Sequence, residues 1–332
     1  MELAPTPRDT VHRDGCAALY RFRRPIESAA EAGVPVLLVP SLINRWYVLD
    51  LRPGASMADA LRRAGLDTFC LDWGAPEDED RYLGWDDVVG RLGRAVRAVR
   101  RRTGARQVAL VGYCMGGTLA AIYTALHPGE VAALVNLAGP IDFSKAGLRG
   151  EMVDPRWFDA EAVAAAGNVA PAQMQAGFVA LRPTAQLAKW FGLVDRAHDP
   201  GARVAFDALE AWAGDNISFP GAAYATYIGE LYQKNLLAKG EHHVGGVRVD
   251  LGSICCPVLA VATERDAICP PAAARALCDL CGSSDREVLT VPGGHVGAVV
   301  GGNAVKILYP ALAAWLGKRC APVGQSTHAS RL

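Results

Sequence analysis

Short, continuously apolar runs alternate along the chain with longer segments whose apolar residues recur every three to four positions. The apolar runs are typical of strands covered on both faces, and the longer spacing is typical of amphipathic helices. Strands are expected at residues 34–40, 67–72, 108–111, 131–137, 257–262 and 287–291, and helices at 57–64, 85–102, 118–126, 271–280 and 304–316. This alternation predicts an α/β fold whose mostly parallel sheet has helices on both faces.

Residues 141–250 interrupt the alternation with helical patterns that contain many aromatic residues and no strong strand. We interpret this segment as a helical cap inserted into the fold. The expected organisation is a core formed by residues 1–140 and 251–317, a cap at 141–250, and a loose C-terminal tail at 318–332.

Composition excludes several classes of protein. Hydrophobic residues make up 51% of the 332 residues, enough to bury a large core. The 34 basic residues balance 34 acidic ones, and this neutrality argues against nucleic acid as a main partner. The sequence shows no signal peptide and no apolar stretch long enough to span a membrane. The nine cysteines are odd in number, which favours free thiols in a reducing cytoplasm. We expect no metal, and interpret the C-x-x-C spacing of Cys278 and Cys281 as one face of a helix.

The strand at 108–111 leads into the motif GYCMGG at 112–117, and a helix follows. A strand, a tight glycine-containing turn and a helix are the context of a nucleophile elbow. The sequence therefore predicts that Cys114 is a nucleophile held at the end of the sheet, where a serine is more usual.

A nucleophile of this kind needs a base, and the base needs an acid that orients it. Asp266 follows the strand at 257–262, and His295 lies in a glycine-rich loop after the strand at 287–291. Both therefore face the same rim of the sheet as Cys114. Glu264 is the competing acid, although its position suits a solvated loop residue. The remaining histidines fit the role of base poorly, because they lie in the tails, at a helix end or in the cap (His12, His127, His198, His242, His243 and His328).

The oxyanion hole is expected to use backbone N–H groups. One is that of Met115, directly after the nucleophile, and the other is that of Leu42 or Ile43, in the loop after the first apolar strand.

Cysteine at the nucleophile position favours acyl transfer. An acyl group on Cys114 is a thioester, so loading from another thioester is nearly balanced in free energy, and transfer to a hydroxyl group is downhill. The thiol also ionises readily beside a histidine. An aromatic cap would exclude water, which competes with the incoming hydroxyl.

Several motifs together resemble those of the polyhydroxyalkanoate synthases, which have the α/β-hydrolase fold. They are LINRWYVLDL at 42–51, DWG at 72–74, GYCMGG at 112–117, WAGDNISFPG at 212–221, GVRVDL at 246–251, Asp266, and PGGH at 292–295. The resemblance implies that Cys114, Asp266 and His295 form a catalytic triad. It also implies a hydroxyacyl-CoA substrate and a polyester product. Trp212, Asp215 and Asn216 of the cap motif are expected beside the substrate.

The resemblance carries further expectations. The first apolar strand starts near residue 34, so the long N-terminal domain of many synthases is expected to be missing. Short synthases of this type work with a separate subunit, which implies a homodimer or a hetero-oligomer. We expect no cofactor, since the CoA thioester is a substrate, and a cytoplasmic location that can include the surface of polyester granules.

Two other functions remain open at this point. One is a hydrolase with the same triad, either a thioesterase or an intracellular polyester depolymerase. The other is a catalytically silent subunit that binds granules or a synthase partner. The arginine-rich helix at 91–102 could meet CoA phosphates, but its pattern favours a solvated helix face.

Overall fold

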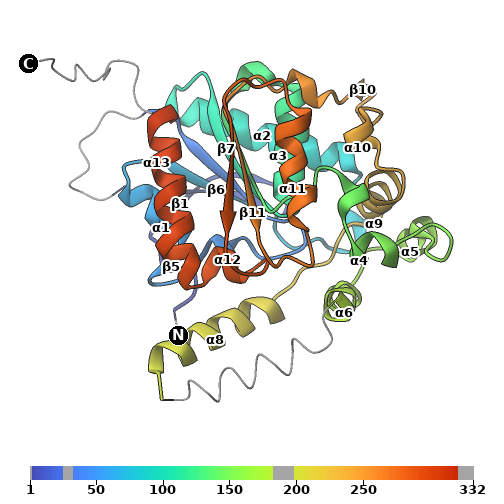
Figure 1. The fold of residues 1–332 in the computed structure, drawn as a ribbon, viewed down its shortest axis with the longest axis horizontal. Coiled ribbons are helices and arrows are strands. Elements are labelled where there is room, and N and C mark those ends of the chain that lie inside the picture. The colour runs from blue at the N-terminus through green and yellow to red at the C-terminus, as the bar shows by residue number, and fades with distance from the viewer. Residues whose placement is uncertain (1, 25–32, 182–197, 321–332) are drawn as a thin grey trace, which may run out of the picture.

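A single eight-stranded sheet forms the centre of the computed structural model, which describes residues 2–24, 33–181 and 198–320 (Figure 1). Its strand order is β1-β2-β6-β3-β7-β8-β11-β12. The strands are β1 (Arg8–Asp14), β2 (Ala17–Phe22), β3 (Val36–Val39), β6 (Thr68–Asp72), β7 (Val108–Tyr113), β8 (Val131–Leu137), β11 (Val258–Thr263) and β12 (Arg286–Val291). From β6 to β12 all neighbours are parallel. The predicted α/β fold is confirmed.

Helices cover both faces of the sheet. On one face lie α2 (Trp85–Thr103), α3 (Met115–Leu126) and α11 (Pro271–Leu280), and on the other α1 (Met57–Arg63), α12 (Gly297–Val300) and α13 (Tyr309–Cys320). Side chains alternate along each strand. Leu37 and Val39 of β3 therefore pack in the core on the face covered by α2, α3 and α11, while Val36 and Leu38 pack in the core on the other face. Both faces of the sheet are therefore buried from solvent, which explains why the inner strands are continuously apolar.

The N-terminal hairpin of β1 and β2 was not predicted from the sequence. We expected the first strand near residue 34 and His12 in a tail, but His12 lies in β1. The two strands pair antiparallel around Gly15, whose φ is +59°, and β2 pairs antiparallel with β6. β1 is an edge strand that is exposed and charged, so it lacks the apolar pattern of the inner strands.

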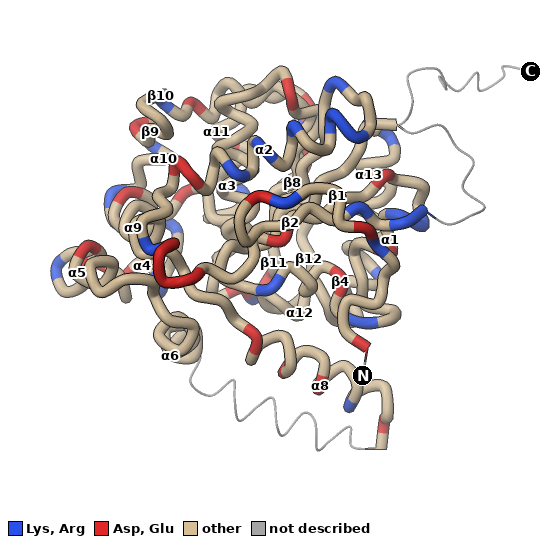
Figure 2. The backbone as a smooth tube through the Cα atoms, turned by 180° about the vertical axis from the view of Figure 1, so that it is seen from behind, with Lys and Arg blue, Asp and Glu red and all other residues tan. Residues whose placement is uncertain are grey.

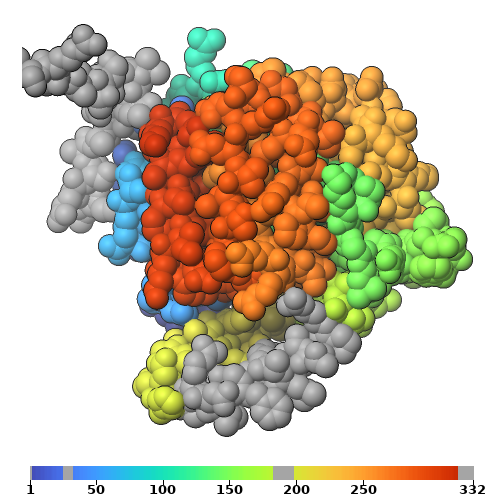
Figure 3. Space-filling view, in the orientation of Figure 1, coloured from blue at the N-terminus to red at the C-terminus, as the bar shows by residue number. Residues whose placement is uncertain are grey.

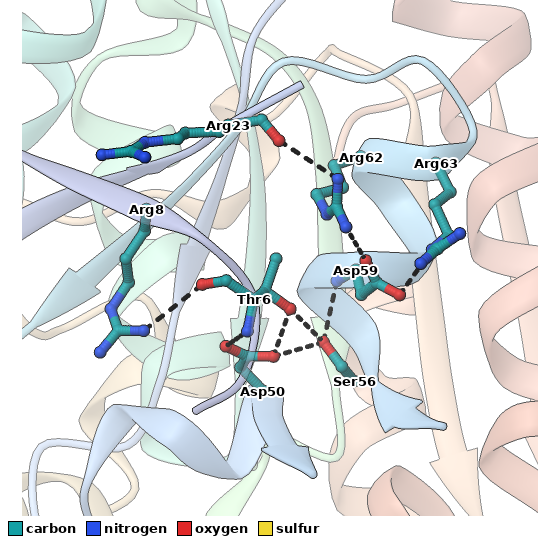
Figure 4. Close-up of polar contacts among 8 residues, drawn as sticks. All are labelled: Thr6, Arg8, Arg23, Asp50, Ser56, Asp59, Arg62 and Arg63. Atoms are coloured by element: carbon teal, nitrogen blue, oxygen red, sulfur yellow. Dashed lines mark hydrogen bonds and ion pairs between the residues drawn. The ribbon is translucent and has the colours of Figure 1, made fainter. Parts of the chain in front are cut away.

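A buried carboxylate joins the N-terminal segment to the loop region after β3 (Figure 4). Asp50 begins β4 (Asp50–Arg52) and accepts hydrogen bonds from the Thr6 backbone N–H (3.1 Å), the Thr6 hydroxyl (2.6 Å) and the Ser56 hydroxyl (2.6 Å). Ser56 also caps α1 by accepting from the N–H of Asp59 at 2.8 Å. This network anchors the end of the loop that runs from β3 to β4.

The chain between β8 and β11 supplies the helices beside and below the carboxyl end of the sheet (Figures 1 and 3). They are α4 (Leu148–Met152), α5 (Ala160–Ala165), α6 (Pro171–Leu181), α8 (Pro200–Gly214), α9 (Gly221–Thr226), a π-helix (Tyr227–Gln233) and α10 (Leu236–Lys239). A small ribbon of β9 (His243–Val244) and β10 (Val247–Arg248) follows. The segment corresponds to the predicted cap, whose boundaries stay a prediction, and its residues 182–197 lie outside the described structure.

The C-terminal part of the core is longer than we expected. A π-helix (Ala304–Leu308) precedes α13, which continues to Cys320, so the prediction of a loose tail from residue 318 was wrong for residues 318–320. Buried side chains at Leu316 and Cys320 hold this last turn against the core. The remainder of that tail, 321–332, lies outside the described residues.

Charged residues of both signs are interspersed over the side of the molecule seen in Figure 2. Along α2, Arg94 pairs with Asp14 at 2.6 Å and Arg100 pairs with Glu130 at 2.5 Å. Of the helices that the structure describes, none is both long enough and apolar enough to cross a membrane.

Candidate active site

Cys114 stands at the turn between β7 and α3 in a backbone conformation that few residues adopt. Its φ is +56° and its ψ is −130°, and its N–H is held by the carbonyl of Leu137 at 2.9 Å. The flanking glycines are sterically necessary. A Cβ atom at Gly116 would lie 2.0 Å from the Val39 carbonyl oxygen, and one at Gly112 would lie 2.3 Å from the Gly116 oxygen. The predicted elbow geometry is present at this turn.

Asp266 and His295 meet at the same rim although 29 residues separate them. Nδ1 of His295 lies 2.7 Å from Oδ2 of Asp266, and both side chains are buried. Three donors fix the carboxylate: the Thr263 hydroxyl reaches Oδ2, and the N–H groups of Ile268 and Cys269 reach Oδ1, all at 2.8 Å.

Glu264, the competing acid, is exposed, and its N–H bonds to the Val291 carbonyl at 3.1 Å. The structure thus brings Asp266, and not Glu264, to the histidine. An ionised carboxylate only accepts hydrogen bonds, so Nδ1 of His295 carries a proton and Nε2 is directed to Cys114. Nε2 is buried and makes no hydrogen bond within the described residues that meets ordinary geometry.

The thiol and the imidazole shift one another's ionisation. Burial raises the pKa of Cys114, but the positive charge of His295 and the N–H of Met115 outweigh it, and the net pKa is lowered. Burial lowers the pKa of His295, but the negative charges of Cys114 and Asp266 raise it to about 10. Both shifts favour a thiolate beside an imidazolium.

Tyr113 is a site residue that the sequence analysis did not identify. Its buried ring stacks on the imidazole of His295, with ring centroids 5.3 Å apart and planes at 29°. The ring limits how the imidazole can turn. Its position directly before the nucleophile is the only sequence signal that could have indicated it.

Of the residues predicted to form the oxyanion hole, Met115 adjoins Cys114 in the chain. Met115 opens α3, and its N–H is close enough to the thiol to lower the pKa of Cys114. Leu42 and Ile43 are buried in the loop after β3. Ile43 lines the same cavity as Met115. The choice between Leu42 and Ile43 as second donor stays a prediction.

Two cavities adjoin the elbow. One, of about 210 Å³, contains Cys114 and His295 in its wall together with Trp212 and Asn216. The other, of about 220 Å³, begins at Ile43 and Met115 and extends between apolar and aromatic side chains, with Arg149 in its wall. Cys114 therefore faces the first cavity while the residue that follows it faces the second.

The three predicted cap residues differ in their surroundings, since Trp212 and Asn216 line the cavity that contains Cys114. Trp212 is buried in α8 and donates from Nε1 to the Arg45 carbonyl at 3.0 Å. Asn216 accepts from the Asn44 amide at 2.5 Å. Asp215, in contrast, is not among the described residues lining either cavity.

Asp215 holds the cap against the loop after β3. Its carboxylate accepts from the Tyr47 hydroxyl at 2.8 Å and pairs with Arg45 at 3.1 Å. The structure therefore gives this carboxylate a role in positioning α8 above the site, and places it away from the lining that we expected it to share with Trp212 and Asn216.

Comparison with known proteins agrees with this architecture. A family model for the alpha/beta hydrolase fold matches residues 34–301. A solved hydrolase from Pseudomonas aeruginosa PA01 superposes with a TM-score of 0.57 at 18% identity, over 93% of this chain and 98% of that one. A likeness at this level of identity establishes the fold alone.

Sequence relatives decide the family. The poly(3-hydroxyalkanoate) polymerase subunit PhaC of Allochromatium vinosum is 37% identical over 95% of this chain and 89% of its own length. The chain belongs to the PhaC family of poly(3-hydroxyalkanoate) polymerases. PhaC of Synechocystis sp. is 34% identical over 95% of this chain and 85% of its own length. Because these PhaC alignments cover nearly the whole chain, they include both the core and the segment between β8 and β11.

Proposed function

We propose that this PhaC family member is an acyltransferase that polymerises (R)-3-hydroxyacyl groups from CoA thioesters into polyhydroxyalkanoate through an acyl group carried on Cys114. The observation that carries the proposal is the placement of a cysteine at the nucleophile elbow beside the Asp266–His295 pair, in a chain 37% identical to a named polymerase subunit.

In the loading step, Nε2 of His295 takes the Cys114 proton. The thiolate attacks the carbonyl carbon of the hydroxyacyl-CoA, and a new C–S bond forms as the bond to the CoA sulfur breaks. The N–H groups at Met115 and in the loop after β3 stabilise the oxyanion. The leaving CoA thiolate then takes the proton from His295. Asp266 holds the imidazole in the tautomer that this exchange requires.

In the transfer step, the hydroxyl group of another hydroxyacyl unit attacks the thioester on Cys114. His295 takes the hydroxyl proton, an oxygen ester forms, and the C–S bond to Cys114 breaks. The chain grows by one unit and the thiolate is regenerated. Every proton and leaving group in this sequence is handled by side chains of the site and by the substrates, so the proposal requires no cofactor or metal.

The proposal extends to the surroundings of the enzyme. We propose that it acts in the cytoplasm, at the surface of the polyester granules that it builds. The catalytic unit is proposed to be a homodimer or a hetero-oligomer with a separate synthase subunit, as the name "subunit" of its relatives suggests.

The decisive experiment incubates the protein with (R)-3-hydroxybutyryl-CoA, measures CoA release, and identifies the product. A polymerase releases CoA and leaves insoluble polyester, whereas a hydrolase releases CoA and free hydroxy acid. Cys114→Ala should abolish CoA release, and Cys114→Ser should leave weak activity, because an oxygen nucleophile remains near His295. Cys255→Ala, which removes an exposed thiol, is the matched control. Free acid as the sole product, or full activity in Cys114→Ala, would overturn the proposal.

A further inference from the structure

Arg149 brings a positive charge to the wall of the cavity that begins at Met115. Its Nε donates to the Tyr232 hydroxyl at 2.9 Å. Its guanidinium carbon lies 4.8 Å from the ring centroid of Phe178 and 5.4 Å from that of Tyr232. Within the described part of the chain, no aspartate or glutamate pairs with it. Aromatic faces and a neutral hydroxyl hold the guanidinium in place and leave its terminal nitrogens with donors to spare.

The surroundings of this charge are unusually apolar. The cavity wall consists mainly of aliphatic, methionine and aromatic side chains, and no described lining residue is a carboxylate. A half-buried guanidinium in such a setting gains most from an oxygen acceptor supplied by a ligand, because hydrogen bonds to a charged donor are strong where water is scarce. The residue is placed to hold a ligand oxygen.

The position of the cavity indicates which part of the substrate enters it. It starts at Ile43 and Met115, two of the residues expected near the thioester oxygen, whereas Cys114 itself lines the neighbouring cavity. A chain attached to Cys114 would enter the cavity past Met115, the residue next to the nucleophile. Phe178, which stacks on Arg149, lines the neighbouring cavity that contains Cys114 and His295. Arg149 and Phe178 thus form part of the wall that separates the two cavities.

We propose that this cavity is an acyl subsite in which Arg149 donates to a hydroxyl or carbonyl oxygen carried by the acyl chain beyond its thioester carbon. The subsite selects oxygen-bearing chains, such as hydroxyacyl esters, over plain alkyl chains of the same length. The inference rests on the proposed function, because it assumes that Cys114 carries the acyl group. Arg149 would then be a specificity-determining residue of the reaction.

The test compares two acyl thioesters of equal chain length, the hydroxybutyrate dimer and octanoyl, both attached to N-acetylcysteamine. This carrier has no phosphate groups, so Arg149 can act only on the acyl chain. Intact-protein mass spectrometry measures the rate of adduct formation on Cys114. Arg149 also favours the Cys114 thiolate, but that effect is the same for both substrates and cancels in the ratio of their rates.

Wild type should prefer the dimer, and Arg149→Met should reduce the ratio about 10- to 100-fold, the usual effect of losing a hydrogen bond to a charged group. Arg149→Lys, which keeps the charge, should retain part of the preference. Tyr232→Phe, which removes only the hydroxyl that holds Nε, should retain most of it. An unchanged ratio in Arg149→Met overturns the inference. A loss of preference that appears only with CoA thioesters also overturns it, because Arg149 would then bind phosphate.

A binding measurement separates this inference from the proposed function. Isothermal titration calorimetry on the Cys114→Ala protein compares the same two thioesters without any reaction. A preference for the dimer that disappears in the double variant with Arg149→Met supports the subsite even if Cys114 forms no adduct in the wild type. Equal binding of the two thioesters in Cys114→Ala refutes the subsite even if the enzyme makes polymer.

Discussion

Replacing Asp266 by asparagine should separate the two halves of the proposed reaction. In the structure, Oδ1 of Asp266 accepts from the N–H groups of Ile268 and Cys269, while Oδ2 faces Nδ1 of His295. The two backbone donors require an oxygen at the Oδ1 position, so the asparagine must place its NH₂ group against Nδ1. The imidazole then carries its proton on Nε2, and that nitrogen can no longer accept one.

The magnitude differs between the steps. Elongation needs Nε2 to accept a proton from a weakly acidic hydroxyl, and the wrong tautomer should slow it about 10³- to 10⁴-fold, or roughly 4–5.5 kcal/mol. Loading is less sensitive, because the Cys114 thiol is far more acidic than a hydroxyl group and can lose its proton to solvent. The resulting thiolate can still accept a hydrogen bond from Nε2. We expect loading to fall about tenfold, the lower end for a lost hydrogen bond to a charged group.

The assay measures both steps in one preparation. Intact-protein mass spectrometry follows the acyl adduct on Cys114 after mixing with (R)-3-hydroxybutyryl-CoA, and CoA release with polymer mass follows elongation. Asp9→Asn is the control, because that exposed carboxylate pairs with Arg23 beside the edge strand β1, at the opposite edge of the sheet from His295. Loss of loading and elongation in equal proportion would refute the division between the steps. Full activity in Asp266→Asn would refute the assignment of Asp266 as the acid that orients His295.

Three further predictions follow from other parts of the structure. Since the pKa of Cys114 is lowered and that of His295 is raised to about 10, iodoacetamide labelling of Cys114, read by peptide mapping, should fall less steeply from about pH 8 to 6 than the labelling of an exposed thiol. The labelling rate of an exposed thiol would fall about tenfold for each pH unit downward. An equally steep fall at Cys114, or unchanged labelling of Cys114 in His295→Gln, would contradict the ion pair. Gly116→Ala should prevent folding or abolish activity, because its Cβ would lie 2.0 Å from a carbonyl oxygen, whereas Gly317→Ala, with open space around it, should raise or preserve the melting temperature. Asp50→Ala should lower the free energy of unfolding by about 2–4 kcal/mol in urea titrations, because it leaves buried donors unsatisfied, and a change below about 0.5 kcal/mol would show that the network does not anchor the loop.

The inner fold could be predicted because its strands are buried on both faces and carry an unambiguous apolar pattern. The helix at residues 271–280 was predicted with the bounds that the structure gives it. The strand β1 was missed because an edge strand faces water and loses that pattern. The strand β2 lies inside the sheet, but Tyr20 and Arg21 interrupt its short apolar run. The extension of α13 to Cys320 was missed because lysine and arginine in a last helical turn look like the start of a solvated tail.

The positions of Cys114, Asp266 and His295 could be predicted because each follows a strand of a parallel sheet, and the carboxyl ends of such strands share one rim. Arg149 and Tyr113 could not be predicted in the same way. Arg149 lies on the five-residue helix α4, whose placement beside the elbow depends on contacts with Phe178 and Tyr232 from distant segments. Asp215 was expected beside the substrate from its motif, and its pairing with Arg45 was not visible in the sequence.

The unusual backbone of Cys114 has an evolutionary consequence. With φ at +56° and ψ at −130°, the residue occupies a conformation that only glycine adopts without strain. For any other residue, this backbone strain destabilises the folded state by about 1–3 kcal/mol. Mutational drift under selection for stability alone would therefore favour glycine at this position, and such a change would remove the nucleophile while making the scaffold easier to fold. A side chain is therefore expected to be retained here only under selection for the reaction, against the thermodynamic preference of the turn.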